Sequence, residues 1–193
     1  MTAKDVLRMQ LNGSFTQVLD RVRSMTDDEW RTRALPETSK PGFIAWHSAR
    51  ILDWGVHCAI QGVPELADQP QWQGLHGTDL AYGAGISASE ADDLPALVSR
   101  REVAEYVSAL QPVALGWLDE QSDADLEKVP TFEANQRVKP RYLTPSVWAE
   151  VSDFVGVPAW HILARPCISH IRVHVGELDT LLQAIRAKAS AAS

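Results

Sequence analysis

The residues with the clearest capacity for chemistry are two histidines near the end of the chain. His170 and His174 stand four residues apart in the segment His170-Ile171-Arg172-Val173-His174. Residues four apart on a helix project from one face, one turn above the other, so both imidazoles can reach a single metal ion. The pair alone is moderately specific, because two histidines at this spacing also occur by chance on solvated or buried faces.

A third histidine, His47, lies in an otherwise apolar and aromatic stretch over residues 43–61. In isolation it would be interpreted as a core histidine bonded to a backbone carbonyl. In a helical bundle, however, this stretch would pack against the helix that carries His170 and His174, and three imidazoles could converge. Three neutral imidazoles leave coordination positions open for water or a small-molecule substrate, as catalytic metal sites do.

Three further side chains could serve such a site. Glu177 follows His174 by three residues and could orient a ligand or a bound water, or it could be a solvated or salt-bridged carboxylate. Cys167 lies on the same helical stripe and could be a fourth ligand, although a small thiol packed beside Pro166 is the favoured interpretation. His76 belongs to a long loop, where it could contact substrate or stand as a surface histidine.

Two other histidines should not reach the same ion. His57 lies about 15 Å along its helix from His47, and His161 falls on nearly the opposite side of a continuous helix from His170. Three tryptophans could line an apolar pocket near the metal or fill the core: Trp46, Trp54 and Trp160.

Helices must position these residues, because apolar residues recur at spacings of three and four almost throughout the chain. The spacing predicts long helices over residues 4–24, 43–61, 87–121 and 159–188, the last kinked near Pro166. Thr26 and Glu29 predict a short helical turn with a capping box. Pro145 can begin a helix that extends to residue 154. Residues 62–87 and 122–144 are expected to be long connections. These elements predict an all-α fold, an antiparallel four-helix bundle with long connecting loops, in a single domain over residues 1–193.

Composition limits the classes of partner. The formal net charge is -7 and no cluster of Lys and Arg could follow a phosphate backbone, which argues against nucleic acid. No uncharged apolar run approaches the roughly 20 residues that span a bilayer, so we expect no membrane segment and a cytoplasmic location. The two cysteines are too few for a disulfide scaffold.

Two segments resemble the second and fourth helices of DinB-like proteins. They are Gly42-Phe43-Ile44-Ala45-Trp46-His47-Ser48-Ala49-Arg50-Ile51-Leu52-Asp53-Trp54 and Ser169-His170-Ile171-Arg172-Val173-His174-Val175-Gly176-Glu177-Leu178. The resemblance covers nearly the whole chain, although the middle matches in layout alone. It implies a four-helix bundle that holds a divalent ion with His47, His170 and His174, and it makes a homodimer plausible.

The resemblance specifies a site better than a reaction. Members of this superfamily include thiol S-transferases that use bacillithiol or mycothiol, a mycothiol-dependent isomerase and proteins assigned as hydrolases. We therefore expect a metal-dependent enzyme that uses zinc, nickel, iron or manganese, with S-transfer from a low-molecular-weight thiol ahead of hydrolysis. The alternatives are a non-catalytic, stress-related metal-binding protein and a structural bundle with vestigial histidines.

Overall fold

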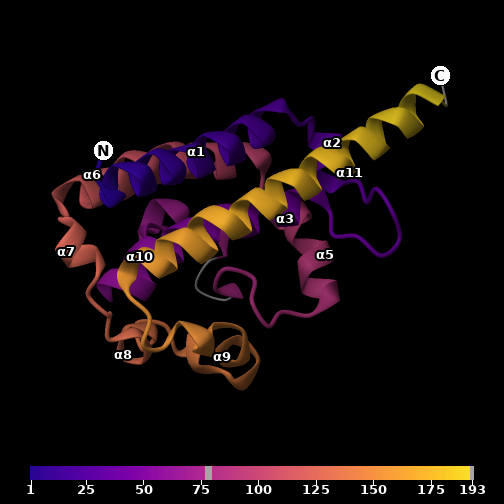
Figure 1. The fold of residues 1–193 in the computed structure, drawn as a ribbon. Helices are drawn as coiled ribbons and strands as arrows, with labels where there is room; N and C mark the ends of the chain where they lie inside the picture. The colour runs from indigo at the N-terminus through magenta and orange to yellow at the C-terminus, as the bar shows by residue number, and fades with distance from the viewer. Residues whose placement is uncertain (77–79, 192–193) are drawn as a thin grey trace.

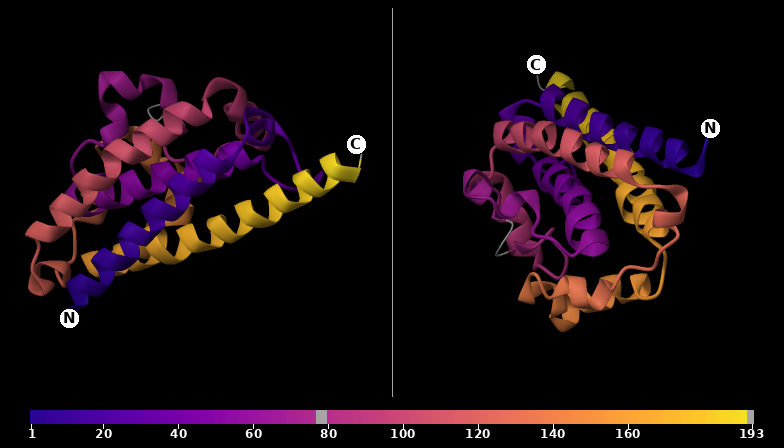
Figure 2. Two further views of the ribbon diagram at one scale, coloured as in Figure 1. Left: turned by 90° about the horizontal axis from the view of Figure 1, so that it is seen from above. Right: turned by 90° about the vertical axis from the view of Figure 1, so that its left-hand side faces the viewer.

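The computed structural model describes residues 1–76 and 80–191, and across these residues the chain is helical with no strand. Helix α1 (Ala3–Ser24) lies beside α6 (Arg100–Glu120), and the long C-terminal helix α11 (Ile171–Ala191) packs against α1 at an angle (Figures 1 and 2). The all-α class predicted from the sequence is thus confirmed. Between these helices lies a continuous apolar core whose fully buried members include Leu11, Phe15, Trp46, Leu110 and Leu178.

The helix that carries His47 has two parts. Helix α3 (Pro41–Asp53) begins at Pro41, whose fixed φ suits a first helical position. From Trp54 the backbone continues as the π-helical segment η1 (Trp54–Gln61), which ends where Gly62 takes a left-handed φ of 68°. The expected helix over residues 43–61 is therefore present, with a change of hydrogen-bond pattern in its second half.

The last helix is also interrupted by a π-helical segment. It starts as α10 (Ala159–Ile162), continues as η6 (Leu163–His170) and then becomes α11. Pro166 lies inside η6, and because proline has no backbone N–H it cannot donate an ordinary helical hydrogen bond there. The irregularity expected near Pro166 thus takes the form of a wider turn directly before the two histidines.

One predicted helix is in fact two helices. The expected element over residues 87–121 divides into α5 (Ala88–Leu97) and α6, separated where Val98 adopts an extended conformation. Ser99 caps α6, since its hydroxyl accepts from the Glu102 N–H while the Glu102 carboxylate accepts from the Ser99 N–H. This capping box starts a new helix in the middle of an apolar periodicity that continues across the break.

The connections contain short helices. Thr26 and Glu29 form the predicted capping box at α2 (Asp27–Arg31). The segment after η1 contains η2 (Leu66–Asp68) and η3 (Pro70–Leu75). The second long connection contains α7 (Asp123–Leu126), α8 (Phe132–Gln136) and η4 (Pro140–Leu143), followed by α9 (Pro145–Val151) and η5 (Ser152–Phe154). Helices α8 and α9 lie on the side of the molecule opposite α1 (Figures 1 and 2).

None of the helices in the described part of the chain combines the length and apolar character needed to cross a membrane.

Candidate metal centre

The three histidines singled out in the sequence converge in space. His47 comes from α3, His170 ends η6 and His174 lies in the first turn of α11. One ring nitrogen from each lies within 4.8 Å of the others. The Nε2 atom of His170 is 3.5 Å from Nε2 of His47 and 3.0 Å from Nε2 of His174. Ligands on a tetrahedral zinc ion at about 2.0–2.1 Å are themselves roughly 3.3 Å apart, so this spacing suits one ion.

The outer ring nitrogens of two of these histidines are held by hydrogen-bond acceptors. Nδ1 of His47 lies 2.5 Å from the backbone carbonyl oxygen of Tyr82, and Nδ1 of His174 lies 3.0 Å from Oε2 of Glu177. Since a carbonyl and a carboxylate accept hydrogen bonds, each Nδ1 carries the proton and each Nε2 keeps a lone pair directed at the other imidazoles. This is the usual arrangement of metal-ligating histidines, whose second nitrogen donates to an oxygen.

The Glu177 contact favours one of the two interpretations left open by the sequence, because the carboxylate bonds directly to His174. The Tyr82 contact was missed. Its acceptor is a backbone carbonyl in a long connection, and no side-chain pattern marks such a group.

The connection that supplies this carbonyl comes close to His47. Gly83 has a φ of 99°, and a Cβ atom placed on it would lie 3.1 Å from Nδ1 of His47 and 3.1 Å from the Trp46 ring. A left-handed φ and a close backbone approach both favour glycine. Gly83 therefore allows the Tyr82 carbonyl to reach the histidine.

Burial keeps two of the imidazoles neutral. It lowers the pKa of His47 to about 3, assisted by the neighbouring His174 and opposed by the hydrogen bond to Tyr82. Burial also lowers the pKa of His170 to about 4, with further contributions from the charges of His174 and Arg165. Neutral imidazole is the form that binds metal, so both side chains are ready to ligate at pH 7.

A cavity of about 410 Å³ opens beside the histidines. Its walls combine aromatic and aliphatic side chains with a few polar groups: His47, Ile51, Trp54, Tyr82, Glu150, Val151, Phe154, Arg165, Pro166, Ser169, His170 and Val173. Small-molecule sites commonly have this composition and a volume of about 300–1,000 Å³. A larger surface groove of about 600 Å³ between α1 and α11 contains none of the three histidines.

The remaining candidates lie away from the three imidazoles. Cys167 is fully buried, and burial raises the pKa of its thiol to about 12. Its sulfur packs against Gly55, where an added Cβ atom would overlap with Sγ. The thiol is thus a packing residue, as the sequence favoured. His57 bonds to Asp53 and His161 packs beside Trp160, so neither belongs to the cluster.

The described residues leave His76 outside this cluster as well, and it caps η3 with a φ of 52°. Of the three tryptophans considered, Trp54 lines the cavity. Trp46 is buried and donates to the Leu75 carbonyl, whereas the partly exposed Trp160 donates to Glu127.

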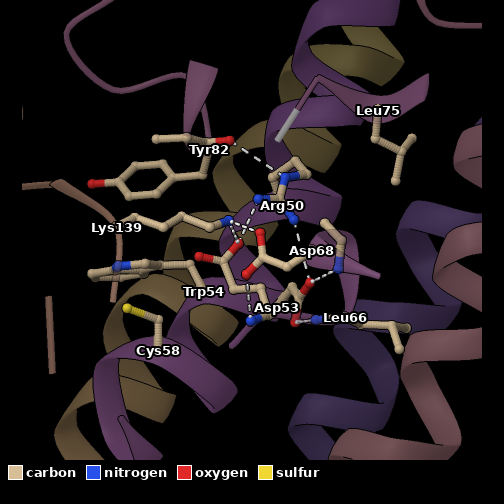
Figure 3. A network of polar contacts seen from close by, with 12 residues as sticks. Arg50, Asp53, Trp54, Cys58, Leu66, Asp68, Leu75, Tyr82 and Lys139 are labelled. Carbon is tan, nitrogen blue, oxygen red and sulfur yellow. Dashed lines mark hydrogen bonds and ion pairs between the residues drawn. The ribbon is translucent and has the colours of Figure 1, made fainter. Parts of the chain in front are cut away.

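Next to the histidines lies a buried polar network, centred on Arg50 one turn after His47 (Figure 3). The Arg50 guanidinium bonds to Glu65, lies 3.3 Å from Oδ2 of Asp53 and donates at 2.9 Å to the Tyr106 hydroxyl. It also donates to the Ala81 carbonyl at 3.4 Å, directly before the residue that holds His47. The network therefore connects α3 and α6 to the connection that carries Tyr82.

A second set of partners completes the charge balance. Lys139 lies 3.2 Å from Glu65 and 2.7 Å from Asp68, and Tyr142 donates to Glu65. Nδ1 of His57 lies 2.5 Å from Oδ1 of Asp53. Burial alone would raise the pKa of Asp53, but the bond from His57 and the charge of Arg50 hold this pKa below its usual value. Sequence reasoning missed the network because its members come from separate segments and show no common spacing.

Comparison of the chain with models of protein families finds no match, and comparison with curated proteins finds none either. The resemblance to DinB-like proteins therefore stays a prediction that rests on the two segments quoted above.

Proposed function

We propose that this protein binds one divalent metal ion through His47, His170 and His174 and uses it in catalysis. The observation that carries the proposal is the convergence of three Nε2 atoms while Nδ1 of His47 and of His174 is held by an oxygen acceptor. A packed core does not require three imidazoles with their Nε2 atoms facing one another. A metal site does.

We further propose that the protein is DinB-like, an antiparallel four-helix bundle. In this proposal its four long elements are α1, α3 with η1, α6, and the α10–η6–α11 helix. Support comes from the order of these elements and from the positions of the three histidines in the second and last of them.

Among reactions, we favour S-transfer from a low-molecular-weight thiol. A bound ion of this kind stabilises a thiolate or acidifies a water molecule. Neither Cys58 nor Cys167 competes for the ion, because both thiols are buried and burial raises the pKa of each. A thiolate from solution would therefore meet no sulfur from the protein at the ion, and the cavity offers room for the rest of the cosubstrate.

Hydrolysis is the second candidate, and Glu150 favours it. This carboxylate lies in the cavity wall, where it could accept a proton from water. The metal could be zinc, nickel, iron or manganese, since imidazole suits several of these ions.

The test begins with the metal content of purified protein. We expect one equivalent in the unmodified chain and in the control His161→Ala, and little in His47→Ala, His170→Ala or His174→Ala. Loaded protein is then supplied with an electrophile and bacillithiol, mycothiol or a simpler thiol, and consumption of both is followed. Undiminished metal in His174→Ala would contradict the site. Metal without any turnover would favour a non-catalytic role.

A further inference from the structure

The wall of the cavity beside the histidines contains a cation that no group of the described residues neutralises. Arg165 lies in its wall, and the guanidinium makes no hydrogen bond or ion pair with another residue of the described chain. Many other arginines are matched with carboxylates, as in the pairs Arg8–Asp119, Arg21–Asp179 and Arg33–Asp92. Arg165 is exposed and lines a cavity in a chain whose net charge is -7.

The π-helical segment η6 places this arginine on the same wall as a candidate metal ligand. Arg165 precedes His170 by five residues, the interval that one π-helical turn brings together. Both residues line the same cavity. A ligand that binds the ion from this cavity therefore lies beside the guanidinium.

The carboxylate of the cavity is already engaged elsewhere. Oε1 of Glu150 accepts a hydrogen bond from the backbone N–H of Gly85 at 3.1 Å. Glu150 and Arg165 form no ion pair, although both line the cavity. A divalent ion on three neutral imidazoles keeps its full charge, so ion and guanidinium together outweigh the single carboxylate. The electrostatic balance favours a ligand with a negative group.

The rest of the wall is apolar and aromatic except for Ser169. Trp54 and Tyr82 lie with ring centroids 4.9 Å apart, and Phe154 stands 6.2 Å from Trp54. Ile51, Val151 and Val173 add aliphatic surface. A ligand that extends from the ion across this wall would bury an apolar body there.

We propose that the cavity selects small molecules with three parts: a donor atom that reaches the metal, an apolar or aromatic body, and a carboxylate that pairs with Arg165. Arg165 then acts as a specificity residue, since its planar guanidinium can hold a carboxylate through two parallel hydrogen bonds. This inference rests on the metal-dependent function proposed above and names the class of ligand that the site accepts.

The test compares two probes that differ in one charge, 3-phenyl-2-sulfanylpropanoate and its primary amide. Zinc-loaded protein is titrated with each by calorimetry, after elemental analysis of every variant. We expect the dissociation constant of the carboxylate to be lower than that of the amide by a factor of about ten. The Arg165→Gln substitution should remove most of this preference. Arg172→Gln is the control, because Arg172 is another exposed arginine of the α10–η6–α11 helix and does not line the cavity.

The outcomes separate the two proposals. Equal binding of the probes, or a carboxylate preference that survives in Arg165→Gln, overturns the role of Arg165 while the metal site stands. A carboxylate that ligates the ion without help from Arg165 would give the second of these results. Absence of stoichiometric zinc in the unmodified protein overturns the metal-dependent function, and this inference with it.

Discussion

Two of the three imidazoles are oriented by a hydrogen bond to a single oxygen atom, and the two oxygen atoms are of different kinds. His47 is held by the backbone carbonyl of Tyr82, whereas His174 is held by the carboxylate of Glu177. The second contact depends on a side chain and can be removed by mutation without altering a ligand.

Replacing Glu177 with Ala should weaken metal binding by about 10–100-fold, the usual cost of losing an outer partner of a ligating histidine. The dissociation constant for zinc, measured in competition with a chelating dye, checks this. Glu105→Ala is the matched control, since Glu105 is an exposed helical glutamate paired with Arg101 and remote from the site. An affinity within two-fold of the unmodified protein would show that Glu177 does not orient His174.

His57 lies outside the cluster, and its pKa is shifted by a neighbouring carboxylate. His57 is buried against Asp53, and although burial lowers its pKa, the hydrogen bond and the charge of Asp53 raise it above the ordinary value of 6.5. A raised pKa in the folded state means that the His57–Asp53 pair stabilises the fold fully below the unfolded pKa of about 6.5. That contribution is lost as pH rises through the folded pKa.

The expected consequence concerns His57→Gln in the presence of a chelator. Its loss in free energy of unfolding, relative to the unmodified protein, should be greater at pH 6 than at pH 9, as measured by urea denaturation. A loss that is equal at both pH values would mean that folding does not raise the pKa of His57.

At the scale of single residues, the sequence predicted which side chains form the site but not which backbone groups do. Helical spacing found His170, His174 and Glu177, and the apolar setting of His47 supplied the third candidate. The Tyr82 carbonyl could not be predicted, because its position depends on the path of a connection with no periodicity. Arg165 was missed since a π-helical turn changes which residues share a face.

The connection over residues 80–85 positions His47, and its shape depends on a glycine. Gly83 and Gly156 both have a left-handed φ, 99° and 81°, but a Cβ on Gly156 would meet no atom within 4 Å. A substitution at Gly156 would therefore cause backbone strain alone, whereas one at Gly83 would cause strain and also contact His47.

Each Gly→Ala change should cost about 1–3 kcal/mol of stability, because alanine is strained at such a φ. Gly83→Ala alone should also weaken zinc binding, since the added methyl group would press on His47. Thermal melts and zinc titrations of both variants check this pair of expectations. Unchanged zinc affinity in Gly83→Ala would mean that the connection can move without disturbing the histidine.

The long helices were predicted within a few residues, because amphipathic periodicity is a strong signal over several turns. Two features escaped it. The break at Val98 depends on a capping box embedded in a continuous apolar pattern. The π-helical character of η1 and η6 arises from packing and from Pro166, and a sequence compatible with an α-helix does not reveal it.

Across the whole molecule, the network around Arg50 connects parts that are distant in the sequence. Its side chains come from α3, from the segment at Glu65, from α6 and from the residues around η4. None of these polar residues carries a sequence signal for burial. Composition and periodicity therefore predicted the helices but not the ion pairs and hydrogen bonds that hold the connections against the core.

Replacing Arg50 with Met should destabilise the protein by about 3–5 kcal/mol, because Asp53 and Glu65 would stay buried without the positive charge of the guanidinium that pairs with them. Arg101→Met is the control, since Arg101 is exposed and its pair with Glu105 is worth at most about 1 kcal/mol. The measurement is the free energy of unfolding in urea. A loss below 1 kcal/mol for Arg50→Met would show that the network rearranges around the gap.

The separation of the histidines along the chain bears on how the protein folds. His170 and His174 become neighbours as soon as one helical turn forms, whereas His47 and His170 stand 123 positions apart in the sequence. An ion added to the unfolded chain would find a two-ligand clip at first and acquire its third ligand only when α3 docks. The number of protein ligands would thus record how far folding has progressed, and the completed centre would act as a removable cross-link closing a long loop.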